Sequence, residues 1–137
     1  YNFKYTNLQA VLGLNQLRTI NKRVNILKNH YKFYKENLIQ NKKFKLIGFD
    51  LKNGELPLWT DVYCTKRNQL FNFLKKKRIS CRYFCYPLNT CKPYKQSFVG
   101  LNNSKLLYGK LMWLPSSLRL KKKDLINICA EINKFIK

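Results

Sequence analysis

The sequence has little negative charge. Only 6 of its 137 residues are Asp or Glu, against 28 Lys and Arg, so the formal net charge is +22. Such a chain would attract nucleic acid, anionic lipid or phosphorylated small molecules, and the sign of the charge does not choose among them. Most of the basic residues are Lys, and Asn and Ile are also frequent, a pattern that compositional drift can produce. Lysine-rich solvated surfaces are the simplest interpretation.

Long apolar runs are also absent. The longest are a few residues, whereas a transmembrane helix needs about 20, and the first segment lacks the regions of a signal peptide. We therefore expect a cytoplasmic protein without a membrane segment. The chain is 45% apolar and 15% aromatic, which favours a folded domain over disorder.

Metal-ligating residues are few and poorly spaced. His30 is the single histidine, and the five cysteines contain no C-x-x-C pair, which does not fit a zinc site. We expect no metal, a partly exposed structural role for His30, and free, mostly buried thiols. The cysteines are Cys64, Cys81, Cys85, Cys91 and Cys129.

The patterns of a self-contained catalytic site are missing as well. The five glycines are scattered and form no phosphate-binding loop, and no nucleophile stands in a recognisable motif with a base. Asp50, Glu55 and Asp61 form no obvious acid–base pair. The residues alone therefore indicate no complete active site in this chain.

The first forty residues predict one long helix. Residues 6–9 fit a capping box, and apolar residues then recur at steps of three and four along residues 17–38. We expect a helix over residues 7–40. Its apolar stripe widens towards the N-terminus, where Ala10 and Gly13 leave room for close contact, which favours packing on a sheet or another domain over a coiled coil.

The rest of the chain predicts an α+β layout with no internal repeat. Alternating and β-branched runs indicate strands at residues 43–49, 56–64, 79–86 and 111–115. Helices are expected at residues 66–77 with Thr65 as the cap, at residues 104–110, and at a C-terminal amphipathic stretch that includes residues 125–136.

The segment FNFLKKKRISCRYFCY interleaves rings and cations, as single-strand nucleic-acid binders do. Aromatic residues at alternate strand positions are usually core, however, and the cations at residues 75–78 fall at a helix end, where they favour the helix dipole. No RNA-binding motif accompanies them. We do not expect nucleic acid as a partner, although a basic nucleic-acid-binding module remains the alternative.

Three motifs follow one another along the chain: YNFKYTNLQAVLGLNQL, ISCRYFCYPLNTCKPY and WLPSSLRLKKKDLINIC. Together they resemble the DegT/DnrJ/StrS family of pyridoxal-phosphate-dependent sugar aminotransferases. YNFKYTNLQAVLGLNQL is similar to the family's G-Y-N-[FY]-R-[ML]-[TS]-x-[LI]-Q-A-A, and ISCRYFCYPLNTCKPY to its G-I-x-[TS]-R-P-x-[FY]-x-P-L-H-x-x-P-x-[FY]. WLPSSLRLKKKDLINIC resembles the closing [LS]-P-[SM]-[SH]-x-x-L-[ST]-x-x-[DE]-[IV]-x-x-[IV]. Together they span nearly the whole chain.

The resemblance implies the C-terminal portion of a fold type I aminotransferase. Residues 1–40 would form a cross-subunit loop and a long linking helix, and residues 41–137 the small domain, a mainly antiparallel sheet with helices packed on one face. The family's Schiff-base lysine lies in a large domain, and no segment here resembles that lysine motif. We therefore expect this segment to be inactive alone.

The resemblance also implies site residues. Asn2 and Lys4 would bind the phosphate of pyridoxal 5'-phosphate in the neighbouring subunit of a homodimer, and Lys4, Arg82 and Asn89 would face the substrate. Lys4 stands for the usual Arg and loses its bidentate fork. Asn89 stands for a His and cannot titrate near neutrality, and Tyr83 stands for a common Pro.

Two further departures concern stability. Arg78 occupies the place of a helix-ending Gly, which costs ~1 kcal/mol if the backbone there is left-handed. Lys121 replaces the usual Ser or Thr cap of the last helix, a loss of about the same size.

By the same resemblance, the function would be amino transfer from glutamate to a nucleotide-linked keto-sugar in surface polysaccharide or amino-sugar biosynthesis. A non-catalytic regulator on the same fold is a further alternative.

Overall fold

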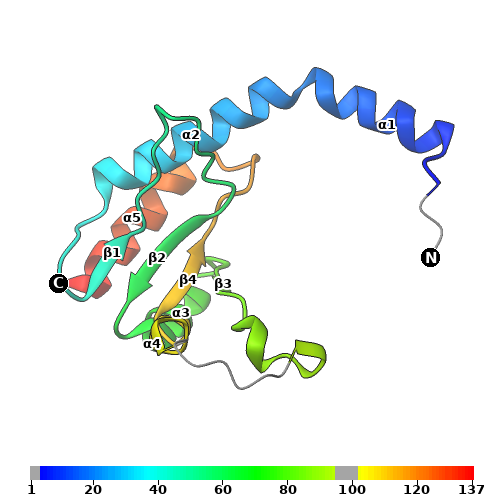
Figure 1. The fold of residues 1–137 in the computed structure, drawn as a ribbon. Coiled ribbons are helices and arrows are strands. Elements are labelled where there is room, and N and C mark those ends of the chain that lie inside the picture. The colour runs from blue at the N-terminus through cyan, green and yellow to red at the C-terminus, as the bar shows by residue number, and fades with distance from the viewer. Residues whose placement is uncertain (1–3, 95–101) are drawn as a thin grey trace.

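The computed structural model describes residues 4–94 and 102–137 (Figure 1). The chain begins with two consecutive helices, continues through a small sheet and ends in a helix that packs beside the second one. The elements are α1 (Asn7–Arg18), α2 (Ile20–Asn37), β1 (Phe44–Leu46), β2 (Thr60–Cys64), α3 (Arg67–Lys76), β3 (Arg82–Tyr83), η1 (Leu88–Thr90), η2 (Lys92–Tyr94), α4 (Asn102–Tyr108), β4 (Leu111–Leu114) and α5 (Lys122–Ile136).

The four strands form an antiparallel sheet in the order β1-β2-β4-β3. Phe44 lies opposite Cys64 in the β1–β2 pair, and Thr60 lies opposite Leu114 in the β2–β4 pair. The edge strand β3 contributes only two residues, Arg82 and Tyr83, which pair with Trp113 and Met112 in the middle of the four-residue strand β4. The strand predicted at residues 79–86 is therefore much shorter than expected.

Helices α2, α3 and α5 cover one face of this sheet and enclose the core. Alternate strand residues point into it, so Val62 and Met112 are fully buried whereas their neighbours Asp61 and Trp113 are only half-buried. The expected α+β fold, a small antiparallel sheet with helices on one face, is confirmed. The core residues on the helices are Leu27, Tyr31, Tyr34, Leu70, Leu74, Leu125, Ile128, Cys129 and Ile132.

The single long helix predicted for residues 7–40 is wrong in two respects, because it is divided at Thr19 and ends at Asn37. Thr19 closes α1 and opens α2: its N–H and its hydroxyl both donate to the Gln16 carbonyl, at 3.1 Å each. A threonine hydroxyl that bonds the preceding turn competes with the helical ladder and bends it. The helix also ends at Asn37, because the backbone of Leu38 is extended.

Helix α3 begins without the expected Thr65 cap. Lys66 is the N-cap residue of α3 and provides no side-chain cap, while the Thr65 N–H donates to the Lys43 carbonyl at 2.9 Å. Thr65 is thus held by the chain just before β1 rather than by the helix.

The end of α3 is a Schellman motif. The Ile79 N–H donates to the Leu74 carbonyl at 2.9 Å, and the Arg78 N–H to the Lys75 carbonyl at 3.0 Å. Ile79 and Leu74 are both buried in the core, which fixes the turn. Arg78 therefore takes the left-handed backbone expected for a glycine, with φ of 59°.

The start of α5 replaces a hydroxyl cap by a carboxylate. Lys121 is the N-cap and its side chain has no acceptor, but the Asp124 Oδ2 atom accepts the Lys121 N–H at 2.8 Å. An aspartate in the first turn also favours the helix dipole. Part of the stability that a Ser or Thr cap would supply is therefore provided by Asp124.

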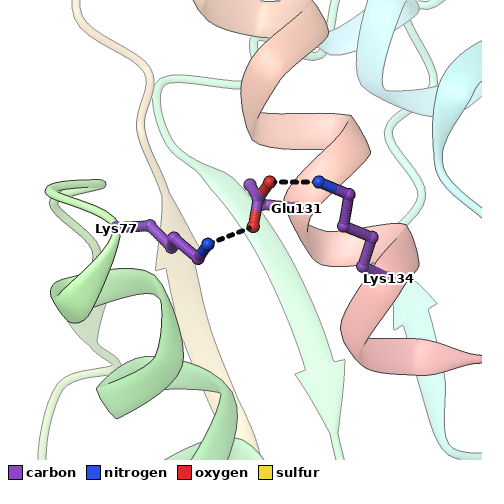
Figure 2. A network of polar contacts seen from close by, with 3 residues as sticks. All are labelled: Lys77, Glu131 and Lys134. Carbon is purple, nitrogen blue, oxygen red and sulfur yellow. Dashed lines mark hydrogen bonds and ion pairs between the residues drawn. The ribbon is translucent and has the colours of Figure 1, made fainter.

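A carboxylate joins α3 to α5 (Figure 2). Glu131 is 8% exposed, and its Oε1 atom lies 2.6 Å from Lys134 Nζ, one turn further along α5. Its Oε2 atom lies 3.5 Å from Nζ of Lys77, the C-cap residue of α3. The two lysines hold the pKa of Glu131 below its ordinary value, chiefly through the Lys134 hydrogen bond.

No helix in the described part of the chain is both long and apolar enough to span a membrane.

Candidate functional site

The first candidate region is the start of α1. Thr6 caps the helix as expected: its Oγ1 atom accepts the Gln9 N–H at 3.3 Å, and the Gln9 Oε1 atom accepts the Thr6 N–H at 2.8 Å. Lys4 is exposed just before this cap, and the first turn contains no acidic residue. Asn2, the other predicted phosphate ligand, lies outside the described residues.

The geometry at Lys4 suits an anion. The N-terminal end of a helix is positive and offers backbone N–H groups, and a lysine beside it adds a full charge. This end of the helix is therefore chemically suited to an anion such as a phosphate group. Tyr5 folds back over the same turn, since its hydroxyl donates to the Gln9 carbonyl at 3.1 Å. A Cβ on Gly13 would lie 2.8 Å from that hydroxyl oxygen, so the glycine makes room for Tyr5.

Helix α1 extends away from the rest of the chain, and none of its residues is buried (Figure 1). Its large apolar side chains are instead 57–72% exposed, unlike those of the second half of α2. The expected packing on a sheet or another domain is therefore observed within this chain for residues 27–38, whereas α1 buries none of its residues against the described part of the chain. The exposed apolar residues are Leu8, Val11, Leu12, Leu14 and Leu17.

The predicted substrate residues lie on the sheet and on the loop after it. Arg82 is the first residue of β3, is exposed, and lies opposite Trp113 of β4. Asn89 is half-buried in the middle of η1, a turn closed by the Thr90 N–H donating to the Pro87 carbonyl at 2.9 Å. These two residues belong to one stretch of chain, whereas Lys4 lies beyond the far end of α1 (Figure 1).

A groove of about 960 Å³ opens beside Arg82. It lies between the first half of α2, the segment before β2, the end of β4 with the segment that follows it, and the start of α5. Trp59 and Trp113 line it and stack on each other, with ring centroids 4.8 Å apart, and Trp59 is 45% exposed. Arg23 and Arg82 add positive charge to its lining. The groove thus combines aromatic and cationic side chains.

Sequence reasoning missed this groove. Trp59 and Trp113 are far apart in the chain and meet only through the β2–β4 register, which pairs Asp61 with Trp113. The one signal was the aromatic residue just before a strand in LPLWTDVYC. Burial raises the pKa of Asp61, and a hydrogen bond from the Trp113 side chain opposes that effect.

His30 is more buried than predicted, with 7% of its surface exposed. Burial lowers the pKa of its imidazole, and a hydrogen bond to the Leu120 backbone acts in the opposite direction. Burial therefore favours the neutral imidazole, as is common for a histidine packed inside a fold. No group of three or more His, Cys, Asp or Glu in residues 4–94 and 102–137 is arranged to hold a metal ion.

The cysteines are free, and three of the five are buried: Cys64, Cys81 and Cys129. The rings of the predicted aromatic and basic segment are used in packing. Phe71 stacks on Tyr83 at 4.2 Å, and Phe73 packs against Phe135 of α5 at 5.5 Å between centroids. These rings support a structural interpretation of that segment over single-strand stacking.

Comparison with known proteins identifies a family. The sequence profile of the DegT/DnrJ/EryC1/StrS aminotransferase family matches residues 1–133. GDP-perosamine synthase of Escherichia coli O157:H7 is 28% identical over 98% of this chain. The chain spans 37% of that relative's length.

Solved structures share the fold. The sugar aminotransferase CalS13 from Micromonospora echinospora superposes with a TM-score of 0.86 over 98% of this chain and 36% of its own length, at 12% identity. Helicobacter pylori PseC, an aminotransferase involved in pseudoaminic acid biosynthesis, superposes with a TM-score of 0.80 over 98% of this chain and 38% of its own, at 19% identity.

Proposed function

Since this chain belongs to the DegT/DnrJ/EryC1/StrS aminotransferase family, we propose that it is the C-terminal part of an enzyme that transfers an amino group from glutamate to a nucleotide-linked keto-sugar. The observation on which this proposal depends is the family match over residues 1–133. Surface polysaccharide or amino-sugar biosynthesis is the corresponding pathway class, and it accords with the name of the E. coli relative.

In this proposal, the Schiff-base lysine belongs to a large domain outside this sequence. Pyridoxal 5'-phosphate supplies the electron sink when bound, and this chain's part is to hold its phosphate and to position the sugar. We assign the boundary near residue 40, with residues 1–40 as the cross-subunit loop and linking helix and residues 41–137 as the small domain. Packing of Tyr31 and Tyr34 into the core joins the second half of the linking helix to that domain.

Asn2 and Lys4 are the proposed cofactor ligands. Their place before α1 supports the assignment, because an amide and an ammonium beside a helix N-terminus favour a phosphate dianion. Because α1 extends away from the sheet (Figure 1), residues at its start are far from the rest of this chain. This supports the proposal that Asn2 and Lys4 bind the cofactor in the partner's active site of a homodimer. Lys4 as a single point charge would bind phosphate well and a carboxylate less selectively than arginine would.

Arg82 and Asn89 are the proposed substrate residues. Arg82 is exposed at the edge of the groove, where a guanidinium can pair with a sugar-linked phosphate. Asn89 can donate to and accept from sugar hydroxyls, and its amide keeps this capacity at every physiological pH because it does not titrate.

The first experiment is to determine the coding DNA upstream of Tyr1 and to express the encoded protein with pyridoxal 5'-phosphate. We expect the same frame to encode a large domain with its lysine. We expect the protein to form one equivalent of 2-oxoglutarate per active site from glutamate alone, and to turn over repeatedly only when a nucleotide-linked keto-sugar is present. A large domain without that lysine, or no turnover with any nucleotide-linked keto-sugar of a broad panel, would overturn the proposed activity.

A complementation experiment tests the cross-subunit role of Asn2. We expect Asn2→Ala homodimers and homodimers lacking the Schiff-base lysine to be nearly inactive, but hybrids of the two to recover about half the activity of one wild-type dimer, because one of their two sites is intact. Activity in the hybrids no higher than in the parents would place Asn2 in its own subunit's site. Lys4→Gln should weaken the binding of pyridoxal 5'-phosphate, and Lys42→Gln, which removes an exposed charge elsewhere, is its control.

A further inference from the structure

One buried arginine contacts both ends of the stretch that contains the proposed substrate residue Asn89. Arg67 is the first residue of α3 and is 8% exposed. Its Nη1 group donates to the carbonyl of Tyr108, the last residue of α4, at 2.6 Å. Its guanidinium carbon also lies 4.4 Å from the ring centroid of Tyr83, the last residue of β3.

Two further N–H groups of Arg67 are satisfied by the next residue in the chain. Its Nε and Nη2 groups both donate to the Asn68 Oδ1 atom, at 3.1 and 3.0 Å, which fixes the plane of the guanidinium. No carboxylate in the described ranges forms an ion pair with it. The charge is therefore balanced by a carbonyl, an amide oxygen and aromatic faces, an arrangement that suits the planar fork of arginine and not the single ammonium of lysine.

The aromatic side of this arrangement is layered. Tyr83 contacts both Arg67 and Phe71, because it also stacks on the Phe71 ring at 4.2 Å with the planes 20° apart. The Tyr108 ring lies 5.6 Å from the same guanidinium and 5.0 Å from the ring of Tyr86. Arg67 thus connects Tyr83 with Tyr108, and Tyr86 joins them through the Tyr108 ring.

Burying this charge is a costly way to stabilise a fold. An apolar side chain of similar size would avoid desolvating the guanidinium, and such replacements are often neutral or stabilising. What arginine adds is geometry, because several directed contacts must be met at once. These contacts bring Tyr83 and Tyr108 close to the same guanidinium. In the sequence, Arg82 directly precedes Tyr83, and Asn89 lies between Tyr83 and Tyr108.

We propose that Arg67 is a positioning residue for sugar recognition: by holding Tyr83 and Tyr108 together, it sets the placement of Arg82 and Asn89 relative to the keto-sugar. This inference rests on the proposed function, because it takes Arg82 and Asn89 to be the sugar-side residues. It concerns the second half-reaction of the enzyme, in which the sugar is the substrate, and leaves the half-reaction with glutamate untouched.

The test compares the two half-reactions in the full protein that contains this chain. Arg67→Lys keeps the charge but loses the fork, and we expect it to raise KM for the keto-sugar roughly ten- to a hundredfold, since small misplacements of binding groups have effects of that order. The rate of the glutamate half-reaction and the cofactor absorbance should remain within about twofold of wild type. Equilibrium binding of the aminated sugar product should weaken by the same factor as KM rises.

Matched variants separate positioning from folding. Tyr83→Phe keeps the ring and should behave as wild type, whereas Tyr83→Leu should reproduce the selective KM effect. Arg119→Lys changes an exposed arginine by the same chemistry and should alter neither half-reaction. In hydrogen exchange, Arg67→Lys should speed exchange in residues 82–90 while residues 125–132 of α5 keep their protection.

The outcomes are distinct. A selective rise in KM with unchanged exchange in α5 supports the positioning role. If Arg67→Lys lowers both half-reactions in parallel with loss of folded protein, or changes neither, the inference is wrong while the proposed function stands. If the wild-type protein transfers no amino group to any nucleotide-linked keto-sugar, the proposed function itself is overturned and the sugar-side role of Arg67 with it.

Discussion

Replacing Arg78 by glycine should stabilise the protein. The Schellman motif at the end of α3 holds Arg78 at a φ of 59°, and two hydrogen bonds and the buried Ile79–Leu74 contact prevent the backbone from relaxing. A residue with a Cβ in this conformation costs about 1 kcal/mol relative to glycine. Arg78→Gly should therefore increase the folding equilibrium constant about fivefold and raise Tm by about 3–5 °C in a chain of this length.

The charge of Arg78 must be separated from its backbone, because removing any cation from a chain of net charge +22 also reduces repulsion. Arg78→Ala is the necessary control, since it removes the same charge and keeps the Cβ. Lys75→Gly places a glycine inside α3 and should instead destabilise by about 1 kcal/mol. Urea unfolding at several salt concentrations measures all three, and an Arg78→Gly variant no more stable than Arg78→Ala would refute the argument.

Three further outcomes are expected. The neighbouring lysines lower the pKa of Glu131 in the folded protein. Its ion pairs therefore stabilise the fold fully above the ordinary glutamate pKa of about 4.3, and this stabilisation is lost as the pH falls through the pKa of Glu131 in the folded state. Glu131→Gln should lower the urea midpoint at pH 7, and the difference from wild type should disappear towards pH 3. Leu70→Ala, at a fully buried site, should cost about 2–5 kcal/mol in unfolding free energy, against under about 0.5 for Leu106→Ala, which is 63% exposed. Exposed Cys85 should react first with a thiol reagent at pH 8. Burial raises the pKa of Cys81 to about 12, so mass spectrometry should find Cys81 modified only after unfolding.

Local signals in the sequence predicted most elements of the fold. The capping box at Thr6 and Gln9 forms as expected because both partners lie within one turn. The left-handed backbone at Arg78 followed from the family's glycine at that place, although the residue itself argues against it. Thr19 was missed, because a threonine within a regular apolar stripe gives no warning that its hydroxyl will bond the preceding carbonyl.

The site was less accessible to sequence reasoning than the fold. Arg82 and Asn89 came from a motif that is contiguous in the chain, whereas the stacking of Trp59 on Trp113 depends on strand register. Arg67 gave no signal at all: it stood at the start of an ordinary amphipathic helix, and its contact with Tyr108 joins residues 41 positions apart. Long-range contacts of this kind follow from topology rather than from any local pattern.

The break at Thr19 divides the chain into parts of unequal stability. Helix α2 is held by the core, but α1 is twelve residues long and has no buried side chain, and an isolated helix of that length is marginal in water. Its helicity must therefore depend on whatever surface covers Leu8, Leu12 and their neighbours. Where that surface is absent, α1 should unfold locally up to Thr19 without loss of the core, so the ordering of α1 measures association of this chain independently of its folding.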